Sequence, residues 1–427
     1  MHQYRRVFPI STLFLDVLLC VGFVPSWAAA APAAAKDAAV QNGVDVLIAD
    51  DFSLLAGKRV GLITNPTGVT RDLRSTIEVL HKSGKVKLVA LFGLEHGVRG
   101  NVHAGDKIND SNDPATGLPV YSLYGKTPKP TTQMLKGIDA LVYDVQDIGC
   151  RSYTYVSSMA DAMEAAAENG VGFVVLDRPN PLTGNRIEGR PLDLKYKSHV
   201  GYFPIPYIYG MTCGELAKMI NGEGWLAGGI KCDLTVVPLK GWRRDMWFDQ
   251  TGLLWVPTSP HVPRADTSMF YAATGIMGEL QVVSEGVGYT LPFELAGGPF
   301  VENAEAFADE LTRRKLPGVQ FRPTYFTPYY MDHVKGKACG GVQIYITDRD
   351  SVDLTAIQFH VMDAVRKLYP QVQLFGGKRD GMFDKVCGTD RIRKMFLEGK
   401  SADEIVKYWN SGRDSFMKQR AKYLIYR

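Results

Sequence analysis

The feature that most constrains the fold of this chain is the alternation of short apolar segments with helix-like segments through its first half. An apolar segment without polar interruptions is typical of a strand that is buried on both faces. Helices between such strands supply the crossovers that a parallel sheet needs. The first half is therefore predicted to be a doubly wound α/β domain, with strands at 59–65, 86–92, 140–144 and 172–177 and helices at 75–83 and 155–169.

The pattern changes after a stiff, proline-rich segment at 254–264, which is predicted to cross between domains. Beyond it, 341–347 alternates apolar and polar residues like a half-buried strand. We therefore expect an N-terminal α/β domain at 41–260 and a smaller α+β domain at 261–427. Two helices of the second domain are predicted at 354–368 and 401–409.

The first thirty residues have the three parts of a signal peptide. Arg5 and Arg6 precede an apolar centre at 14–24, and small residues at 28–30 form a cleavage site. The apolar centre is too short to span a membrane, and the paired arginines also allow twin-arginine export. We expect cleavage near 28–30, a disordered mature terminus over 31–40, and a periplasmic or secreted protein.

Charge and cysteine content exclude some classes of partner and site. The 49 basic and 45 acidic residues are spread along the chain without a basic run, which argues against nucleic acid as a partner. The cysteines that remain after cleavage are odd in number and irregularly spaced, so buried free thiols are expected. The sequence lacks a Cys-x-x-Cys motif, which argues against a structural zinc site. Cys213 and Cys232 are the pair that we would test first for a disulfide.

Polar and glycine-rich loops follow all four predicted strands of the first half, at 65–68, 93–99, 144–153 and 177–184. Ligands of open α/β sheets bind beyond the carboxyl ends of the strands. Four such loops on one edge predict a functional site there.

Three kinds of site fit these loops poorly. The glycine pattern at 222–227 follows a helical segment instead of a strand, so we interpret it as a helix stop and not as a dinucleotide loop. His96, His103 and Asp106 lack the spacing of metal ligands on a helix. No Gly-x-Ser-x-Gly elbow is present, and nothing pairs Cys150 with a particular histidine. We therefore expect neither a metal nor a cofactor.

The loop "FGLEHGVRG" at 92–100 offers carboxylate chemistry. Glycoside cleavage needs an acid that protonates the leaving oxygen, and Glu95 lies where a strand enters a loop whose glycines let a substrate approach. His96 and Arg99 could orient this acid or bind an anionic group. The alternative is an ion pair between Glu95 and Arg99 that orders the loop, and the residues alone leave both open.

The segment 278–289 supplies two further carboxylates, Glu279 and Glu285, just after the proline-rich segment. It could close over the strand-end loops. Four aromatic side chains could stack on sugar faces, although core packing is the commoner role for any one of them. They are Tyr153, Tyr155, Trp255 and Tyr289.

With these residues in view, the chain from about residue 40 onward resembles the exo-β-N-acetylmuramidase (NamZ-like) family of peptidoglycan hexosaminidases. The resemblance rests on long blocks in the same order, namely "GLITNPTGV", "GLEHGVRG", "VYDVQDIGCRSYTY", "LDRPNPLTG", "GMTCGELA", "LTVVPLKGW" and "GYTLPFELAGGP".

The resemblance implies a Rossmann-like N-terminal domain, a smaller C-terminal domain and an active site in the cleft between them. It implies release of terminal N-acetylmuramic acid from the non-reducing end of peptidoglycan disaccharides or muropeptides, with Glu95 as the catalytic acid. The second catalytic group is either Glu279 or the acetamido group of the substrate. The remaining candidate substrate-binding residues are Asn65, His96, Arg99, Gln146, Asp147, Arg151, Tyr153, Asp177, Arg178 and Asn180.

The sequence departs from the family pattern on the second side of the expected cleft. Leu280-Gln281-Val282 stands where many relatives have Gly-Thr-Asn, Val287-Gly288-Tyr289 replaces Arg-Gly-Thr, and His261 replaces Asn. Tyr209-Gly210 replaces Arg-His, in a looser alignment. These changes allow a related amino sugar as substrate. A non-catalytic receptor for sugars or muropeptides, or an exported esterase or amidase, are the alternative functions.

Overall fold

The computed structural model describes residues 39–100, 110–125 and 127–427. The predicted signal peptide, most of the segment 31–40, His103 and Asp106 lie outside the described residues. Of the predicted disordered terminus only residues 39 and 40 are described, and Val40 is buried in a small cluster with Leu239 and Trp242.

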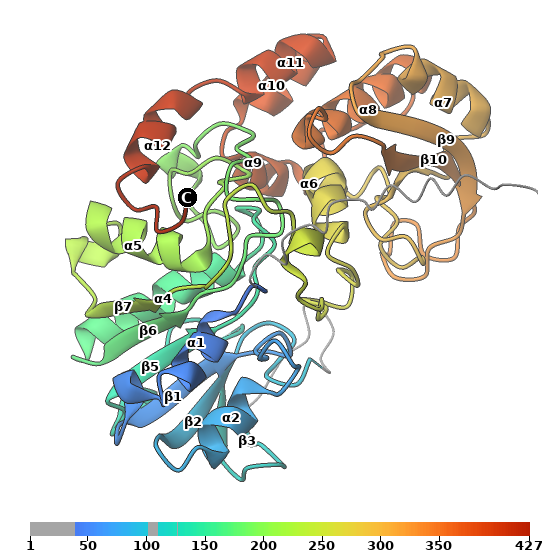
Figure 1. Ribbon diagram of the computed structural model, residues 1–427. Helices are drawn as coiled ribbons and strands as arrows, with labels where there is room; N and C mark the ends of the chain where they lie inside the picture. Colours follow the sequence, from blue (N-terminus) through green and yellow to red (C-terminus); the bar gives the residue numbers. More distant parts are fainter. Residues whose placement is uncertain (1–38, 101–109, 126) are drawn as a thin grey trace, which may run out of the picture. The chain divides into compact units, whose positions relative to one another are not determined.

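A seven-stranded sheet dominates the first half of the chain, in the order β3-β4-β2-β1-β5-β6-β7 (Figure 1). All neighbouring strands are parallel except β3 and β4, which are antiparallel. Without the two-residue β3, the strands follow the 3-2-1-4-5-6 order of a doubly wound dinucleotide-binding fold. The strands are β1 (Arg59–Thr64), β2 (Lys87–Gly93), β3 (Ser111–Asn112), β4 (Pro119–Ser122), β5 (Ala140–Asp144), β6 (Gly172–Leu176) and β7 (Leu234–Val237).

Helices cover both faces of this sheet, as the uninterrupted apolar strands predict. Successive residues of a strand point to opposite faces; in β5, Leu141 belongs to one apolar cluster and Val142 to the other. The first cluster contains α4 (Tyr155–Glu168) and α5 (Cys213–Glu223), and the second contains α1 (Gly43–Ala49) and α2 (Thr76–Lys82). The doubly wound α/β prediction is therefore confirmed.

A separate three-stranded antiparallel sheet follows in the second half, in the order β8-β10-β9. Its strands are β8 (Leu295–Gly298), β9 (Val319–Phe326) and β10 (Cys339–Ile346), and α6 (Thr267–Gly278), α7 (Ala304–Thr312) and α8 (Leu354–Leu368) pack with it in one apolar cluster. That cluster also holds Ile148 and Cys150 from the loop after β5. The smaller sheet-containing part is thus confirmed, while the boundary at residue 260 stays a prediction.

Helix ends follow the expected local signals. The glycine pattern at 222–227 is the end of α5, where Gly224 caps the helix with φ of 69°, a conformation that glycine adopts at little cost. The helix predicted at 401–409 is α11 (Ala402–Trp409), which begins with a capping box on Ser401. The remaining helices are α3 (Thr132–Leu135), α9 (Asp380–Cys387), α10 (Arg391–Leu397) and α12 (Arg413–Arg420), with 3₁₀ turns at Ser53–Leu55, Leu194–Tyr196, Ala227–Gly229 and Phe248–Thr251.

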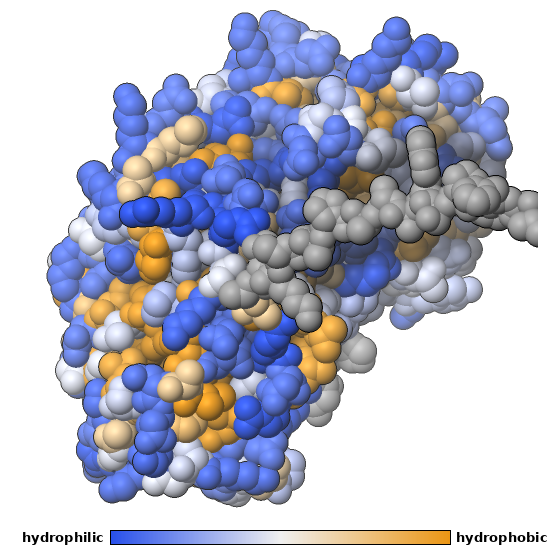
Figure 2. Space-filling model, viewed as in Figure 1, coloured by the Kyte–Doolittle hydropathy of each residue, from blue (hydrophilic) through white to orange (hydrophobic). Residues whose placement is uncertain are grey.

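The cysteines within the described ranges are all buried free thiols, and Cys213 and Cys232 are not bonded to each other. No helix among the described residues has the length and apolarity needed to cross a membrane. The face of the molecule in Figure 2 is mainly hydrophilic, with apolar side chains in scattered groups.

Candidate active site

Glu95 lies in a tight turn directly after β2. The backbone N–H of Gly97 donates to the carbonyl oxygen of Leu94 at 2.9 Å, so Glu95 and His96 are the two central residues of a β-turn. His96 has a φ of 72°, whereas Glu95 is not among the residues of positive φ, which is the pattern of a type II turn. This position favours glycine, and a side chain there costs about 1–2 kcal/mol. Strain of this kind is typical of functional sites.

Glycine lets this loop pack closely against the loop that follows β1. A Cβ atom on Gly100 would lie 2.4 Å from the Cγ atom of Pro66. Arg99, whose side chain is 40% exposed, binds the fully buried carboxylate of Asp113 through Nε and Nη2, at 2.9 and 3.0 Å. Burial raises the pKa of Asp113, but hydrogen bonds from Thr116 and the pairing with Arg99 lower the pKa by more than burial raises it. The net shift of the pKa is therefore downward. Arg99 therefore joins this loop to Asp113, which directly follows β3.

Three titratable side chains lie within the electrostatic reach of Glu95. Burial raises the pKa values of Tyr153 and Tyr155, and the negative charge of Glu95 contributes to both shifts. Burial lowers the pKa of His199, while Glu95 acts in the opposite direction. Glu95, itself half-buried, therefore shares its surroundings with two tyrosines and a histidine.

Hydrogen bonds to Thr258 hold the proline-rich segment beside these tyrosines. The Tyr153 hydroxyl lies 2.6 Å from the Thr258 hydroxyl, and the Tyr155 hydroxyl donates to the Thr258 carbonyl oxygen at 2.6 Å. Tyr155 is 2% exposed and has a core role, whereas Tyr153 is half-buried. The loops at the carboxyl ends of β2 and β5 and the segment 254–264 thus meet around Glu95.

Several predicted substrate-binding residues also lie at the carboxyl edge of the sheet, but they bind other parts of the protein. Arg178 forms a buried ion pair with Asp144, with Nε and Nη2 at 2.6 and 3.0 Å from its carboxylate, and donates to the carbonyl oxygen of Val69. The Asp144 carboxylate also accepts from the Thr76 hydroxyl at 2.6 Å. This arrangement couples the loops after β1, β5 and β6.

Asp177 is fully buried and accepts hydrogen bonds from Thr212, Gly214 and Tyr426. Burial raises its pKa to about 6, although these donors oppose the shift. Since Tyr426 belongs to the end of the chain, Asp177 joins β6 to residues far away in sequence.

Arg151 is 1% exposed and donates to the backbone carbonyl oxygens of Arg190, Ile205, Val386 and Cys387. It therefore connects the loop after β5 to α9. Its guanidinium is enclosed by backbone and is not presented at the surface.

The amide side chains of Gln146, Asn180 and Asn65 brace the loops that carry them. Gln146 donates to two backbone carbonyl oxygens and Asn180 to one. The Asn65 side-chain oxygen accepts from both the backbone N–H and the hydroxyl of Thr67. All three are buried.

Asp147 is a buried carboxyl with one unsatisfied oxygen. Its Oδ1 accepts from the Gly149 N–H at 2.7 Å and the Tyr209 hydroxyl at 2.8 Å, while Oδ2 has no hydrogen-bond partner among the described residues. Burial raises the pKa of Asp147 to about 7. Asp147 is thus partly protonated near neutral pH.

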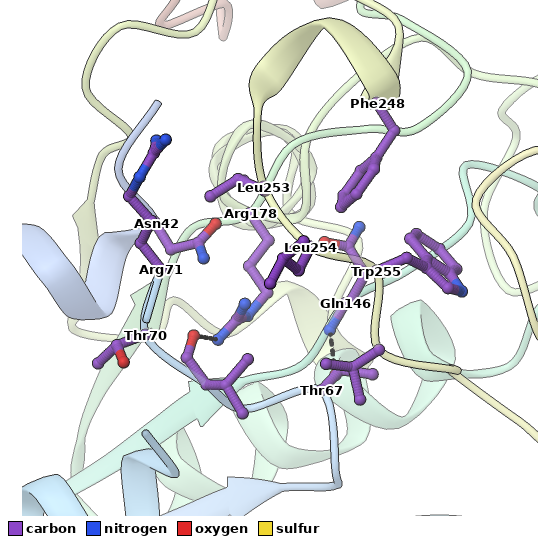
Figure 3. Close-up of a pocket in the computed structure, with 12 residues that line it drawn as sticks. Asn42, Thr67, Thr70, Arg71, Gln146, Arg178, Phe248, Leu253, Leu254 and Trp255 are labelled. Atoms are coloured by element: carbon purple, nitrogen blue, oxygen red, sulfur yellow. Dashed lines mark hydrogen bonds between the residues drawn. The ribbon is translucent and has the colours of Figure 1, made fainter. Parts of the chain in front are cut away.

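A small pocket lies where the strand order reverses, beyond β1 and β5, and Figure 3 shows residues that line it. Gln146 and Arg178 come from the loops after β5 and β6, and Leu253, Leu254 and Trp255 come from the start of the proline-rich segment and the residue before it. Its volume is about 20 Å³, which is close to the space that one water needs. At the point where many doubly wound proteins hold a ligand, this pocket therefore has room for about one water.

Glu279, predicted on the second side, caps the carboxyl end of α6 and is bound by Arg379. Arg379 donates to its Oε2 at 2.6 Å and to its backbone carbonyl oxygen at 2.9 Å. Burial raises the pKa of Glu279 and outweighs the opposing effect of Arg379. Glu279 also contributes to the raised pKa of Tyr271, whose ring meets that of Tyr153 edge-on at 5.6 Å. A tyrosine pair therefore links the surroundings of Glu95 and Glu279.

Glu285 is 4% exposed and packs against Gly278, where an added Cβ atom would lie 2.7 Å from its carboxyl carbon. Burial raises its pKa to about 7, and Oε2 has no hydrogen-bond partner in the part of the chain that the structure describes. The second carboxyl of the segment 278–289 is thus enclosed behind α6.

Sequence reasoning missed four residues of this region, namely Thr258, His199, Tyr271 and Arg379. His199 and Tyr271 come from segments without a glycine- or carboxylate-rich motif, whereas Arg379 follows Gly376 and Gly377 in a loop that no predicted strand precedes. Long-range packing brings these residues together. Only the proline-rich character of 254–264 pointed to one of them.

The family models "Exo-beta-N-acetylmuramidase NamZ, N-terminal" and "C-terminal" match residues 60–266 and 269–426. The peptidoglycan β-N-acetylmuramidase NamZ of Bacillus subtilis (strain 168) is 46% identical over 417 residues, which cover 97% of this chain and 98% of that protein.

Two crystal structures of DUF1343 family proteins from Bacteroides fragilis NCTC 9343 are similar to the chain. One has a TM-score of 0.86 at 51% identity and the other 0.71 at 31%, and each comparison covers 91% of this chain and 99% of that structure. The chain therefore belongs to the exo-β-N-acetylmuramidase NamZ family.

Proposed function

We propose that the chain is a glycosidase that releases terminal N-acetylmuramic acid from the non-reducing end of peptidoglycan fragments, with Glu95 as the general acid. The observation that carries the proposal is the 46% identity to a peptidoglycan β-N-acetylmuramidase over nearly the whole of both chains. The turn that holds Glu95 between β2 and the two tyrosines supports the assignment of the acid.

In the proposed reaction, the Glu95 carboxyl donates its proton to the glycosidic oxygen as the bond to the leaving sugar breaks. The type II turn fixes the Glu95 backbone, and the two tyrosines on which the charge of Glu95 acts are held in place by Thr258. Of the three predicted arginines, Arg151 and Arg178 are buried against other groups, whereas Arg99 is 40% exposed. We assign the solvent-facing part of the Arg99 guanidinium to the lactyl carboxylate, since Nε and Nη2 already bind Asp113 and the side chain is 40% exposed.

The second catalytic group is proposed to be Glu279. Arg379 holds its carboxylate beside the tyrosine pair that also borders Glu95. The acetamido group of the substrate is the alternative, and a prediction below separates the two.

The experiment compares wild type with Glu95→Gln on a muramic-acid disaccharide and on an aryl N-acetylmuramide with a good leaving group. We expect Glu95→Gln to lose about 10²–10⁴-fold in kcat on the disaccharide, and less on the aryl substrate, because a good leaving group needs little protonation. Glu78→Gln is the matched control, since Glu78 is an exposed glutamate on α2 that pairs with Lys82.

Two outcomes would contradict the proposal. Equal activity of Glu95→Gln and wild type on the disaccharide would remove Glu95 from the acid role. Tight binding of muropeptides without turnover by the wild type would favour a sugar receptor, and release of peptide or acyl groups without sugar cleavage would favour an amidase or esterase.

Export is part of the proposal, because peptidoglycan lies outside the cytoplasmic membrane and the first thirty residues have the composition of a signal peptide. Fractionation of cells that produce the full chain should place a shortened protein in the periplasm or medium. A full-length cytoplasmic protein would contradict it.

A further inference from the structure

A second hollow, here called the α4 hollow, lies along α4 and has a volume of about 490 Å³. That volume is within the usual range of small-molecule sites, about 300–1,000 Å³. It is much larger than the pocket where the strand order reverses. Its principal lining residues are Asp161, Lys197, His199, Tyr202, Phe203 and Trp225.

One wall of the α4 hollow is aromatic. The half-buried Trp225 stacks on the buried ring of Phe203, with centroids 5.4 Å apart and an interplanar angle of 16°. Tyr202 meets Phe203 edge-on at 5.9 Å and His199 edge-on at 5.8 Å. Phe203 thus supports Trp225 from behind, and such a wall suits the apolar face of a sugar ring.

Polar groups stand beside this wall. The Tyr202 hydroxyl is 3.1 and 3.2 Å from the two oxygens of Asp161, and the Lys197 ammonium lies 5.3 Å from the centre of the Tyr202 ring. Glu164 is already occupied by Lys129 and by the backbone N–H of Ala227. The Asp161 carboxylate, which accepts from the Tyr202 hydroxyl, and the Lys197 ammonium thus line the hollow together. This nearly balanced pair suits the hydroxyl and acetamido groups of a neutral sugar better than an anion.

His199 connects the α4 hollow to the acid. It lines the hollow, and the charge of Glu95 acts on it. Leu94, the residue before Glu95, belongs to the same apolar cluster as Tyr155, which opens α4, and Phe203, which lines the hollow. The hollow therefore lies on the part of the molecule to which Glu95 belongs.

We propose that the α4 hollow binds the N-acetylated, uncharged sugar on the leaving-group side of the bond that is cut. The proposal rests on the proposed function, because it assigns the place of the second sugar of the same substrate. In peptidoglycan that sugar is N-acetylglucosamine.

The test compares Lys197→Ala with Lys195→Ala. Both lysines are exposed and lie over neighbouring tyrosine rings, Tyr202 and Tyr196, but only Lys197 lines the hollow. Trp225→Leu and Tyr202→Phe are the further variants. If Trp225→Leu does not fold, Tyr202→Phe still tests the proposal. We expect Trp225→Leu to raise the KM for the disaccharide at least fivefold more than the KM for the aryl muramide, Lys197→Ala to act in the same direction, and Lys195→Ala to show no such difference.

The second readout is a titration of each variant with methyl β-N-acetylglucosaminide, followed by NMR. Saturable binding by wild type that weakens in Lys197→Ala and Tyr202→Phe supports the hollow even if no substrate is cleaved, so failure of the proposed function is recognised separately. Equal effects of the variants on both substrates, or binding that is unchanged in all variants, would overturn the proposal.

Discussion

The Tyr155 hydroxyl donates a hydrogen bond of 2.6 Å to the backbone carbonyl oxygen of Thr258, over a separation of 103 residues. Because Tyr155 opens α4 and Thr258 lies in the proline-rich segment, this bond fixes that segment beside the edge of the sheet where Glu95 stands. The neighbouring contact of Tyr153 with the Thr258 hydroxyl repeats the connection.

Tyr155→Phe should lower the free energy of unfolding by about 1–3 kcal/mol, because the buried carbonyl oxygen of Thr258 loses its donor. Urea denaturation measures the change. Tyr289→Phe is the control, since Tyr289 is 39% exposed, and should change stability little. Equal stability of the two variants would contradict the role given to Tyr155.

Arg178→Met should be among the most damaging changes at the sheet edge. It leaves the Asp144 carboxylate buried with only the Thr76 hydroxyl as a side-chain partner in the described structure, and breaking a buried pair costs about 3–5 kcal/mol. Arg59→Met is the matched control, because the Arg59–Asp139 pair is exposed and exposed ion pairs contribute little to stability. The double variant Arg178→Met/Asp144→Leu should recover part of the loss in urea denaturation.

Asp147 should make stability fall as pH rises between about 4 and 7. The pKa of its folded form is about 7, whereas an unfolded aspartate has a pKa of about 3.9. In this window the folded state keeps a proton that the unfolded state has released, so rising pH disfavours folding. Asp147→Asn does not titrate; its stability relative to wild type should therefore increase from pH 4 to 7 and level off above pH 7.

Asp113→Asn is the control of opposite sign in the same denaturation series. The pKa of Asp113 is lowered in the folded state, so its contribution is present above a pH of about 4 and is lost as the pH falls. The deficit of Asp113→Asn should therefore be largest at neutral pH. Parallel curves for both variants would contradict these pKa directions.

Glu279→Gln separates the two candidates for the second catalytic group. If the Glu279 carboxylate acts as nucleophile or base, replacing it by a neutral amide should lower kcat about 10²–10⁴-fold. Sodium azide should restore turnover of the aryl muramide if Glu279 is a nucleophile. A loss below tenfold without azide rescue would assign the second role to the acetamido group of the substrate.

Arg99→Ala should affect recognition of the lactyl group. If Arg99 binds that carboxylate, kcat/KM should fall at least tenfold for an aryl N-acetylmuramide and much less for the aryl N-acetylglucosaminide, which lacks the lactyl group. Asp113→Asn is the control, because it weakens the ion pair that holds the loop at 92–100 but keeps Arg99 itself. Equal losses on both glycosides would give Arg99 a purely structural role.

The regular part of the fold could be predicted because the apolar residues of each buried strand indicate that both of its faces are covered. The segment 140–144 is apolar throughout and forms β5 at those positions, and α8 has the predicted bounds of 354–368. The short strands β4 and β7 escaped prediction, since strands of four residues contain too little pattern to distinguish them from a buried loop.

The candidate site was only partly predictable for a different reason. A polar residue at the end of a strand can face a ligand or bind its neighbouring loops, and the sequence is the same in both cases. Arg151, Asp177 and Arg178 have internal partners up to 249 residues away in sequence, and no local pattern encodes such partners. His199 became visible only through its place near Glu95.

The bond between Asp177 and Tyr426 has a consequence for synthesis. Asp177 is buried at the end of β6, yet one of its donors is the hydroxyl of Tyr426. The backbone N–H groups of Ile425 and Tyr426 also donate to Glu215 on α5. Until residues 425 and 426 have been synthesised, Asp177 therefore lacks one of its donors and Glu215 lacks two. The N-terminal half is a domain by topology, but residues more than 160 positions beyond residue 260 complete its buried hydrogen bonds.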